Sequence, residues 1–508
     1  MDEWDDGQVC KLWEGIYQAN WQKGLARLKK ISGVVLGFHS VIDGVKHVKS
    51  TELERLLHLN EIVTNSFERS TGFPDEIRSP DDFLACLLAS MQKGKAMQRM
   101  IRNAATFQWL LDELGYDFPR LGGTSGNMSS ALTPLGVKIL VYASPLTTDL
   151  AELFVQADNL NVLVEEDGRP VLKTPRAAAS RPGIEAIHWI FEYPEGLTIR
   201  VGARQFTTPR ANRFIASWNP VNNQLRIDPS FKRGLLQLAG EFSHFIVSGF
   251  HILSEIYPDG TTYKECLLPV AEYLADLKRK NPGLRVHAEF ASIGSARIRQ
   301  GVVDWILPET DSLGLNEVEL AALVRDANCP ALAGRLESAE SITDVLEASY
   351  LVTCRSGLSR IHLHNLGYYL CLVRPGYARD ADACESARIG YHDGIRENGG
   401  RSRGRRDTIL SGLIAAATLA ASRTTRGFVS SNDDEIGANL EHPISVRGLA
   451  ALRELDNYLA AQGELVETGV TRYKEYDLAL VPAKVVARPV LTVGLGDLIS
   501  SSAFLAMG

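Results

Sequence analysis

The chain has 508 residues, 45% hydrophobic and 23% charged, which is typical of a globular protein with a sizeable core. Its net charge of −7 argues against a nucleic-acid-binding protein, because such proteins usually carry a basic domain. The seven widely spaced cysteines, the acidic N-terminus and the lack of an apolar run of about 18 residues predict a cytoplasmic protein without disulfides, zinc, signal peptide or membrane span.

Apolar periodicity predicts the elements in chain order. Residues 8–30 have apolar side chains at helical spacing, which predicts an amphipathic helix, and similar patterns recur at 263–280 and 317–325. Apolar, β-branched runs predict buried strands at residues 31–38, 138–143, 244–247, 284–290, 302–307 and 489–493. Strands that alternate with helices predict an α/β fold, in which helices cover both faces of a parallel sheet.

Two stretches, at about 40–125 and 186–217, do not follow this alternation. The second has the period-2 pattern of antiparallel strands, interrupted by a Pro-Glu-Gly turn. We interpret both as parts of a smaller α+β lid over the ends of the main sheet, where α/β proteins bind their ligands. The predicted organisation is an N-terminal helix over residues 1–30 and a main domain over residues 31–508 that includes the lid.

The stretch 376–407 is rich in glycine, arginine and aspartate. This composition predicts a surface loop. The alternative is a loop that steers phosphate groups through its clustered arginines, Arg401, Arg403, Arg405 and Arg406.

The C-terminal segment 491–500 carries the pattern most suggestive of chemistry. Its predicted strand ends in Gly494-Leu495-Gly496, and a helix is expected to begin at Asp497. Glycines let a backbone come close to a ligand, and the first N–H groups of a helix favour an anion. A carboxylate beside them can act as a general base, so the segment suits phosphoryl transfer. The alternative for Asp497 is a helix N-cap. No GxxxxGK[ST] run occurs, which disfavours a P-loop enzyme.

Three further segments could bind a polar ligand. Asp43 leaves the first predicted strand and could accept hydrogen bonds from sugar hydroxyls, or cap a turn. The second segment contains the paired glycines Gly122 and Gly123, followed by the amide of Asn127. This pattern suits the close approach of a small polar molecule, and an ordinary turn is the alternative. In the third segment, Arg210 and Arg213 lie on either side of Asn212. Two arginines around an amide suit phosphate recognition, and the alternative is that they are ordinary surface residues.

Carboxylates in two other segments suggest a metal site. Asn316 and Glu319 have the spacing of a capping box, which is the simpler interpretation. They could also hold Mg²⁺ through water, because this ion keeps several of its waters. His287 and Glu289 share one face of a predicted strand, which could aim a second carboxylate at the same ion.

Together these segments resemble the ADP-dependent phosphofructokinase/glucokinase family of the ribokinase-like superfamily. The resemblance runs from about residue 31 to 508. Its most specific stretches are GGTSGNMSSAL (122–132), PRANRFI (209–215), HAEFAS (287–292), DSLGLNEVEL (311–320), RIHLHNLGYY (360–369) and TVGLGD (492–497). It implies a ribokinase-like parallel sheet flanked by helices, with a lid that closes over a sugar. It also implies transfer of the β-phosphoryl group of ADP, with Mg²⁺ as cofactor.

The resemblance assigns roles to the residues singled out above. Asp497 is the expected base. Backbone donors to the moving phosphoryl group are Gly494, Leu495 and Gly496. The residues expected to act on Mg²⁺ are Glu289, Asn316, Glu319 and Asp497. The residues expected to bind the sugar, the phosphates or the closing lid are Asp43, Gly122, Gly123, Asn127, Arg210, Asn212 and Arg213. The stretch around His362 and His364 marks the family without an assigned chemical role.

Three positions depart from the family pattern. Val41 stands where asparagine is common, Gln98 where many members have a glutamate that meets the sugar, and Leu498 where threonine is usual. The missing carboxylate, with Arg200 and Arg204 in the lid-like stretch, favours fructose 6-phosphate as the acceptor. The alternatives are a glucokinase or bifunctional enzyme, an ATP-using kinase, and a non-catalytic sugar- or nucleotide-binding paralogue. The sequence leaves the oligomeric state open.

Overall fold

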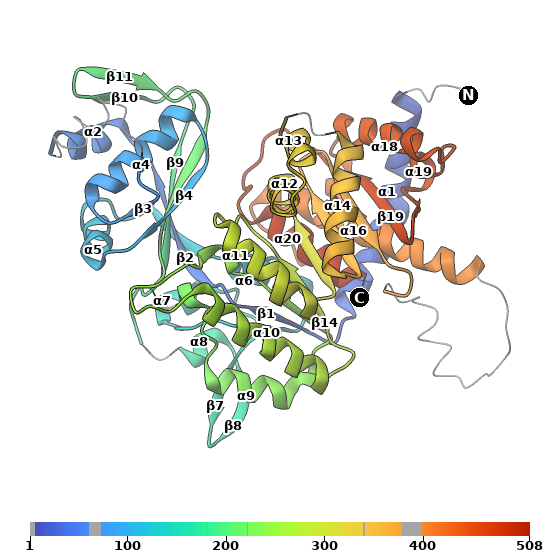
Figure 1. Ribbon diagram of the computed structural model, residues 1–508, viewed down its shortest axis with the longest axis horizontal. Helices are drawn as coiled ribbons and strands as arrows, with labels where there is room; N and C mark the ends of the chain where they lie inside the picture. The colour runs from blue at the N-terminus through green and yellow to red at the C-terminus, as the bar shows by residue number, and fades with distance from the viewer. Residues whose placement is uncertain are drawn as a thin grey trace.

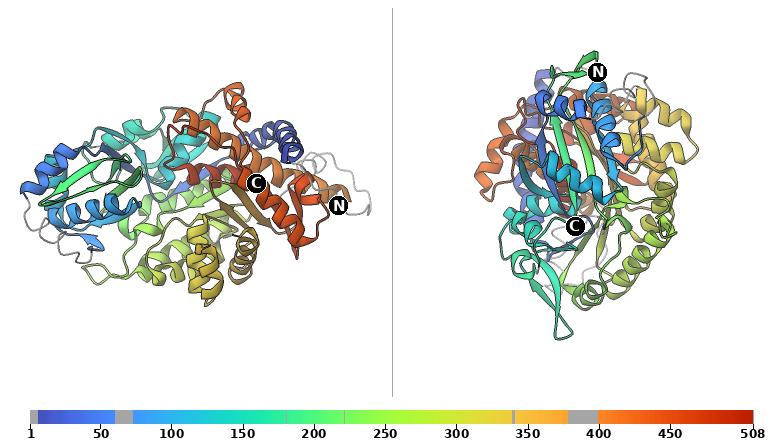
Figure 2. Two further views of the ribbon diagram at one scale, coloured as in Figure 1. Left: turned by 90° about the horizontal axis from the view of Figure 1, so that it is seen from above. Right: turned by 90° about the vertical axis from the view of Figure 1, so that its left-hand side faces the viewer.

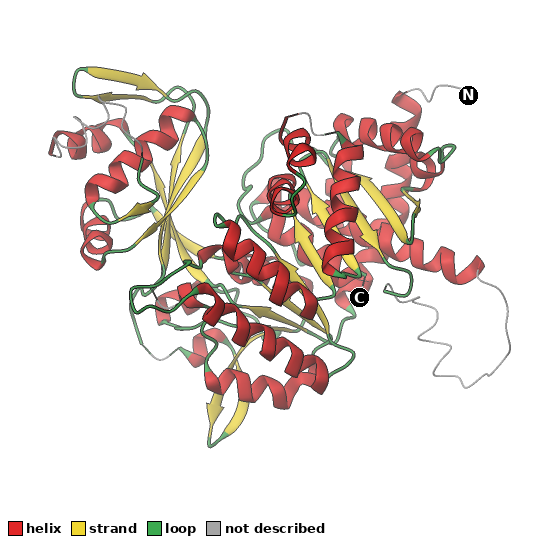
Figure 3. Cartoon of the chain, in the orientation of Figure 1, coloured by secondary structure: helices red, strands yellow, loops and turns green. Residues whose placement is uncertain are grey.

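In the part of the chain that the structure describes, an eleven-stranded sheet forms the body and a six-stranded sheet projects from it (Figure 1). This computed structural model describes residues 6–59, 73–179, 181–220, 222–338, 341–377 and 399–507. Helices pack against both sheets (Figure 3). None of the described helices is both long and apolar enough to cross a lipid bilayer.

Seven parallel strands form the centre of the large sheet. In spatial order they are β16 (Arg360–His364), β15 (Ser312–Leu315), β14 (Arg285–Glu289), β13 (His244–Val247), β1 (Val34–Gly37), β6 (Ile139–Val141) and β7 (Leu160–Glu166). Antiparallel strands extend both edges: β17 (Tyr368–Val373), β19 (Tyr476–Pro482) and β18 (Val470–Tyr473) beyond β16, and β8 (Arg169–Lys173) beyond β7. The predicted α/β fold is therefore confirmed, with a mixed but mainly parallel sheet.

Helices cover both faces of the large sheet, as two perpendicular views show (Figure 2). On one face, three helices pack against one another: α1 (Asp6–Lys29), α16 (Gly399–Arg426) and α20 (Leu495–Ala506). The opposite face carries α10 (Tyr263–Lys280), α11 (Ala296–Gly301), α12 (Glu317–Asp326), α13 (Pro330–Ser338) and α14 (Ile342–Ser356). The remaining helices of the body are α6 (Thr124–Leu132), α7 (Thr148–Leu153), α8 (Pro175–Ala178), α9 (Pro229–Leu238), α17 (Asp433–Gly437), α18 (Val446–Leu459) and α19 (Glu464–Thr468).

The smaller sheet takes its strands from two separate parts of the chain. Its order is β3 (Glu76–Ile77), β4 (Met97–Ile101), β12 (Asn212–Trp218), β9 (Ile187–Tyr193), β2 (Val41–His47) and β5 (Phe118–Gly122). The helices of this unit are α2 (Ser50–Leu59), α4 (Pro80–Lys93) and α5 (Ala104–Glu113), and a hairpin joins β10 (Thr198–Val201) to β11 (Arg204–Thr207). The unit has its own apolar interior, where the Phe83 ring lies 4.9 Å from Phe191 and 5.9 Å from Phe214.

The element predictions succeed where periodicity is strong and fail where an apolar run is short. The predicted helices at 8–30, 263–280 and 317–325 and the first four predicted strands are all observed. The predicted strand at 302–307 is wrong, because residues 302–306 form a π-helical turn that continues α11. A six-residue run with five apolar residues fits a buried helical turn as well as a strand, so periodicity cannot decide between them. The predicted strand at 489–493 is also wrong, because this stretch is a loop with a bend at Val490 and a turn that begins at Val493.

The predicted arginine-rich loop needs a correction as well. Residues 378–398 lie outside the described part of the chain, but residues 399–407 begin the long helix α16. Arg405 Nε lies 3.1 Å from Asp477 Oδ2, and Arg406 Nη1 lies 2.7 Å from Glu464 Oε1. These two arginines therefore bind acidic side chains of β19 and α19. The side chains of Arg401 and Arg403 lie outside the described residues.

Candidate active site

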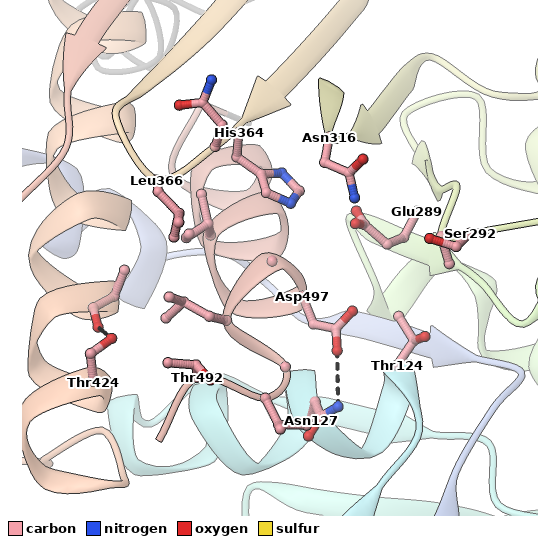
Figure 4. A pocket seen from close by; sticks show the side chains of 18 of the residues that line it. Thr124, Asn127, Glu289, Ser292, Asn316, His364, Leu366, Thr424, Thr492 and Asp497 are labelled. Atoms are coloured by element: carbon pink, nitrogen blue, oxygen red, sulfur yellow. Dashed lines mark hydrogen bonds between the residues drawn. The ribbon is translucent and has the colours of Figure 1, made fainter. Parts of the chain in front are cut away.

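A cleft of about 830 Å³ lies between the carboxyl ends of the parallel strands and the smaller sheet. Elements far apart in the sequence supply its walls: β2, β4, β9 and β12 of the smaller sheet, and β14, α12, β16, α16 and the start of α20 of the body. Figure 4 shows the carboxyl group of Asp497 near the middle of this cleft, with Asn127 on one side and Glu289 and Asn316 across from it.

Asp497 is held from two sides. Asn127 Nδ2 donates a hydrogen bond of 2.9 Å to Asp497 Oδ2 (Figure 4). The orientation of this amide is fixed by Arg423, whose Nη2 donates to Asn127 Oδ1 at 3.4 Å. Since a guanidinium can only donate, the amide oxygen must face Arg423 and the amide nitrogen must face Asp497. The amide of Asn127 therefore binds the carboxylate of Asp497.

The pKa of the Asp497 carboxyl group is raised into the range that suits a general base. Burial raises the pKa of Asp497 to about 6, although the hydrogen bond from Asn127 and the charge of Arg423 act in the opposite direction. A base with a pKa near the working pH is ionised at neutrality and still basic enough to take a proton. Asp497 therefore has the properties of a general base.

Asp497 is not the helix N-cap, which corrects the alternative weighed from the sequence. The helix α20 begins at Leu495, and its N-cap is Gly494 with a φ of 68°. Asp497 thus occupies the third position of the first turn. A Cβ atom on Gly494 would lie 2.5 Å from Asn127 Cγ, and one on Gly496 would lie 2.6 Å from His364 Nε2. Both glycines are required by the cleft side chains that pack over them.

The first turn of α20 offers backbone donors next to the base. The N–H of Leu495 bonds to Thr492 O at 3.4 Å, and that of Leu498 to Gly494 O at 3.2 Å. The N–H groups of Gly496 and Asp497 fall in the part of a helix that has no acceptor within the helix. With the positive end of the helix dipole behind them, they can bind an anionic oxygen. Of the three predicted donors, Gly496 is therefore the best placed.

Two further carboxylates face the same cleft. Glu289 ends β14, and burial raises its pKa well above the ordinary value, with the negative charge of Asp497 adding to the effect. Glu319 lies in the first turn of α12, and burial raises its pKa to about 7. The predicted capping box is present, because Asn316 Oδ1 accepts from Glu319 N at 3.0 Å and Glu319 Oε2 accepts from Asn316 N at 3.0 Å.

These groups fit a hydrated cation better than a directly ligated one. The described residues contain no group of three His, Cys, Asp or Glu side chains that could hold a metal ion. The oxygen of Asn316 is already used by two backbone N–H groups of α12, which leaves its NH₂ group to contact bound water. The charge of Asp497 raises the pKa values of Glu289 and Glu319, and a nearby cation would counteract this effect.

Asp43 lies at the other end of the cleft, where β2 leaves the body. Its carboxyl group is buried, and Arg120 Nε lies 3.6 Å from its Oδ2. Burial raises the pKa of Asp43 to about 6 despite the neighbouring Arg120 charge. Its buried Oδ1 has no hydrogen-bond partner among the described residues, and His188 Nδ1 lies 3.7 Å from it. Gly122 is required here because a Cβ atom would lie 1.9 Å from Asp43 Oδ1.

Comparison with known proteins assigns this cleft to a family. A model of the ADP-specific phosphofructokinase/glucokinase conserved region matches residues 32–506. The chain belongs to the ADP-specific phosphofructokinase/glucokinase family. It is therefore an ADP-dependent sugar kinase, as the sequence motifs implied.

Its relatives have two different activities. An ADP-specific phosphofructokinase of Methanosarcina acetivorans is 30% identical over 504 residues, which cover 97% of each chain. An ADP-dependent glucose/glucosamine kinase of Pyrococcus abyssi is 29% identical over 502 residues, covering 97% of this kinase and 98% of the relative. The solved structure of an ADP-dependent kinase in complex with fructose 6-phosphate and ADPβS matches with a TM-score of 0.80 at 30% identity, covering 97% of both chains.

The PRANRFI segment (209–215) does not enter the kinase cleft as a whole. Arg213 lines the cleft, on β12. Arg210 Nε and Asn212 Nδ2 instead donate to the backbone oxygen of Gly94, in the turn before β4. The structure therefore does not bring Arg210 and Asn212 to the cleft with the other predicted substrate residues, and both stabilise a turn of the smaller sheet.

Three histidines near the Asp43 end of the cleft were missed from the sequence. The ring of His39 lies 5.1 Å, centroid to centroid, from those of His188 and His251, and all three line the cleft. Burial lowers the pKa of each, so they offer neutral imidazoles to a ligand. They come from three distant segments of the chain, so their proximity is a property of the fold.

Proposed function

We propose that this kinase transfers the β-phosphoryl group of ADP to fructose 6-phosphate, giving fructose 1,6-bisphosphate and AMP. The observation that carries the proposal is the charge at the acceptor end of the cleft. Arg213 and Asp43 line the cleft there, Arg120 lies beside Asp43, and Glu192 is a further acidic neighbour of Arg213 outside the cleft lining. A guanidinium group at the cleft wall, Arg213, suits an acceptor that brings its own negative charge.

Gln98 supports the same acceptor. Its side chain lines the cleft from β4, and its Nε2 donates to Ser217 Oγ at 3.0 Å. The amide takes the place where many family members carry a glutamate that meets the sugar. A neutral amide at this point does not repel a sugar phosphate as a carboxylate would. The fructose 6-phosphate complex of a 30% identical kinase agrees with this choice.

Asp497 then acts as the base. The acceptor hydroxyl attacks the β-phosphorus of ADP, its proton passes to Asp497, and the bond from the β-phosphorus to the bridging oxygen breaks to release AMP. The N–H groups of Gly496 and Asp497 and the positive end of α20 stabilise the charge on the moving group. Asn127 and Arg423 hold the Asp497 carboxylate in place for this transfer.

Magnesium is proposed as the cofactor, held through water by Glu289, Glu319 and Asn316. When bound, it neutralises charge on the phosphates of ADP. The smaller sheet is proposed to act as a lid, because Asp43 and Arg213 on its strands would close over the acceptor. Closure would exclude water and so limit wasteful hydrolysis of ADP.

The test measures AMP formation from ADP and Mg²⁺ with fructose 6-phosphate and with glucose in parallel, and with ATP as a control donor. We expect a kcat/KM for fructose 6-phosphate at least about tenfold above that for glucose, and little turnover with ATP. A preference for glucose or glucosamine would support the second candidate, the activity of the Pyrococcus abyssi relative. Binding of sugar without AMP release would instead indicate a non-catalytic paralogue.

A further inference from the structure

A fully buried arginine lies behind the carboxylates of the cleft. Arg360 begins β16, and none of its surface is exposed. Its Nη1 donates to Ser312 Oγ at 2.8 Å, its Nε faces the sulfur of Met507 at 3.3 Å, and its Nη2 has no hydrogen-bond partner among the described residues. Burying a guanidinium that has no carboxylate partner among the described residues is costly, so its presence here calls for an explanation.

Ser312 connects this arginine to the His-x-Glu segment. Ser312 Oγ lies 2.8 Å from His287 Nδ1, on the neighbouring strand β14. Because Arg360 can only donate, the hydroxyl oxygen of Ser312 accepts from it, and the hydroxyl hydrogen is free to point to His287 Nδ1. A neutral imidazole that accepts at Nδ1 carries its proton on Nε2.

His287 Nε2 faces the catalytic side of the network. It lies 3.0 Å from Ser500 Oγ and 3.3 Å from Glu289 Oε2. A proton on this nitrogen is therefore donated toward the serine and the carboxylate. The hydroxyl of Ser500 can in turn donate to Glu289. Every bond in the series then runs in one direction, from the guanidinium to the carboxylate of Glu289.

The backbone beside this network has no room for a side chain at position 314. The network crosses directly over Gly314 of β15, where a Cβ atom would lie 2.0 Å from Ser500 Oγ, 2.4 Å from Glu289 Oε2 and 2.8 Å from His287 Nε2. The ring of His287 is stacked on Phe504, with centroids 4.8 Å apart and planes at 24°. Stacking and the missing side chain at position 314 together leave the imidazole one orientation.

We propose that Arg360 is a positioning residue, which through Ser312 fixes His287 as the Nε2–H tautomer and so orients the Glu289 carboxylate toward the cleft. Ser500 lies one helical turn after Asp497 on α20, so the same network ties Glu289 to the helix that carries the base. A partner that orients a carboxylate in this way commonly contributes 10- to 100-fold, roughly, to metal affinity or activity.

The first test observes the tautomer without any ligand. The kinase is labelled with ¹⁵N at the histidine rings, and the His287 signals are assigned by their loss in His287→Gln. We expect wild-type His287 to be protonated on Nε2 alone, and Ser312→Ala to give a mixture of both tautomers. Ser349→Ala removes another fully buried serine hydroxyl outside the network and should leave the His287 signals unchanged. Protonation of wild-type His287 on Nδ1 would overturn the proposal.

The second test measures the Mg²⁺ concentration that gives half-maximal AMP formation, and this arm rests on the proposed function. Ser312→Ala and Arg360→Met are expected to raise it by roughly 10- to 100-fold, and Arg360→Lys, which can still donate to Ser312, by less. Thermal unfolding identifies a variant that has lost its fold, and Ser312→Ala then carries the test alone. Wild-type Mg²⁺ dependence in a folded Ser312→Ala kinase would contradict the positioning role. If the wild-type chain has no kinase activity, the tautomer measurement still tests whether Arg360 and Ser312 fix the tautomer of His287.

Discussion

Asn127 donates a 2.9 Å hydrogen bond to Asp497, although 370 residues separate the two positions in the sequence. The bond joins the first turn of α6 to the first turn of α20, and these two helices pack against each other. Arg423 Nη1 reaches the backbone oxygens of both Asn127 and Gly494 at 3.4 Å, so it holds the two helix ends together. The geometry of the base is thus set by three helices.

Replacing Asn127 should move the pH dependence of the kinase. The hydrogen bond from Asn127 lowers the pKa of Asp497, and its loss should raise that pKa above about 6. Because the base must be ionised, the acid limb of kcat/KM should move to higher pH in Asn127→Leu. Asn161→Ala, which removes a partly exposed amide on β7, serves as the control. An acid limb that stays in place would show that Asn127 does not act on Asp497.

Removing the charge of Asp497 should separate catalysis from binding. Asp497→Asn is expected to lower kcat by at least about 10²-fold, the lower end of the range for general-base catalysis. The affinity for ADP, measured by calorimetry, should be unchanged or higher, because a carboxylate next to the phosphates has been neutralised. Asp304→Asn, on the exposed surface of the body, should leave both quantities unchanged. Near-normal turnover in Asp497→Asn would rule out its role as the base.

The sequence predicts those parts of the fold that local pattern determines. The predicted strand at 244–247 has the observed bounds, because its apolar, β-branched run ends shortly before a glycine with a left-handed backbone, Gly249. The similar run at 302–307 became a helical turn, because α11 leads directly into it. Local pattern cannot tell a buried strand from a buried helical turn of this length. Contacts with the preceding helix decide the outcome.

The site was predictable where residues lie close together in sequence and not where the fold joins distant ones. The Gly-x-Gly-Asp segment indicated the base and its anion site from adjacent positions. The sequence predicts a substrate role for Asn127, and its bond to Asp497 is not predictable because it depends on two helix ends meeting. Arg423 had only one signal in the sequence, a charge near the end of a long run of small and apolar residues in α16. His39 and His251 had none, since each follows an ordinary strand.

Gln98 gives a direct test of acceptor choice. Gln98→Glu places a carboxylate in the cleft at the acceptor end. Repulsion from the phosphate of fructose 6-phosphate should lower kcat/KM for that sugar by roughly tenfold more than for glucose. Gln98→Leu keeps the approximate volume without the charge and should affect both sugars alike. A ratio that does not change in Gln98→Glu would show that this side chain is remote from the bound sugar phosphate.

Glu319 should make the free kinase less stable as the pH rises. Burial raises its folded-state pKa to about 7, above the ordinary value of 4.5. Below about pH 4.5 the group is protonated in both states and burial costs little. As the pH rises toward 7, this group ionises first in the unfolded chain. The free energy of unfolding therefore falls by up to about 3 kcal/mol because of this group.

Glu319→Gln removes this titration. We therefore expect the Tm of the wild type, relative to that of Glu319→Gln, to fall between pH 5 and about pH 7.5, as the linkage relation requires. Thermal unfolding in the absence of ligands measures the difference, and Glu317→Gln in the same helical turn provides the control. Added Mg²⁺ should reduce the difference at the higher pH, because a cation near Glu319 favours its ionised form. A Tm difference that is the same at both pH values would mean that Glu319 ionises normally in the folded protein.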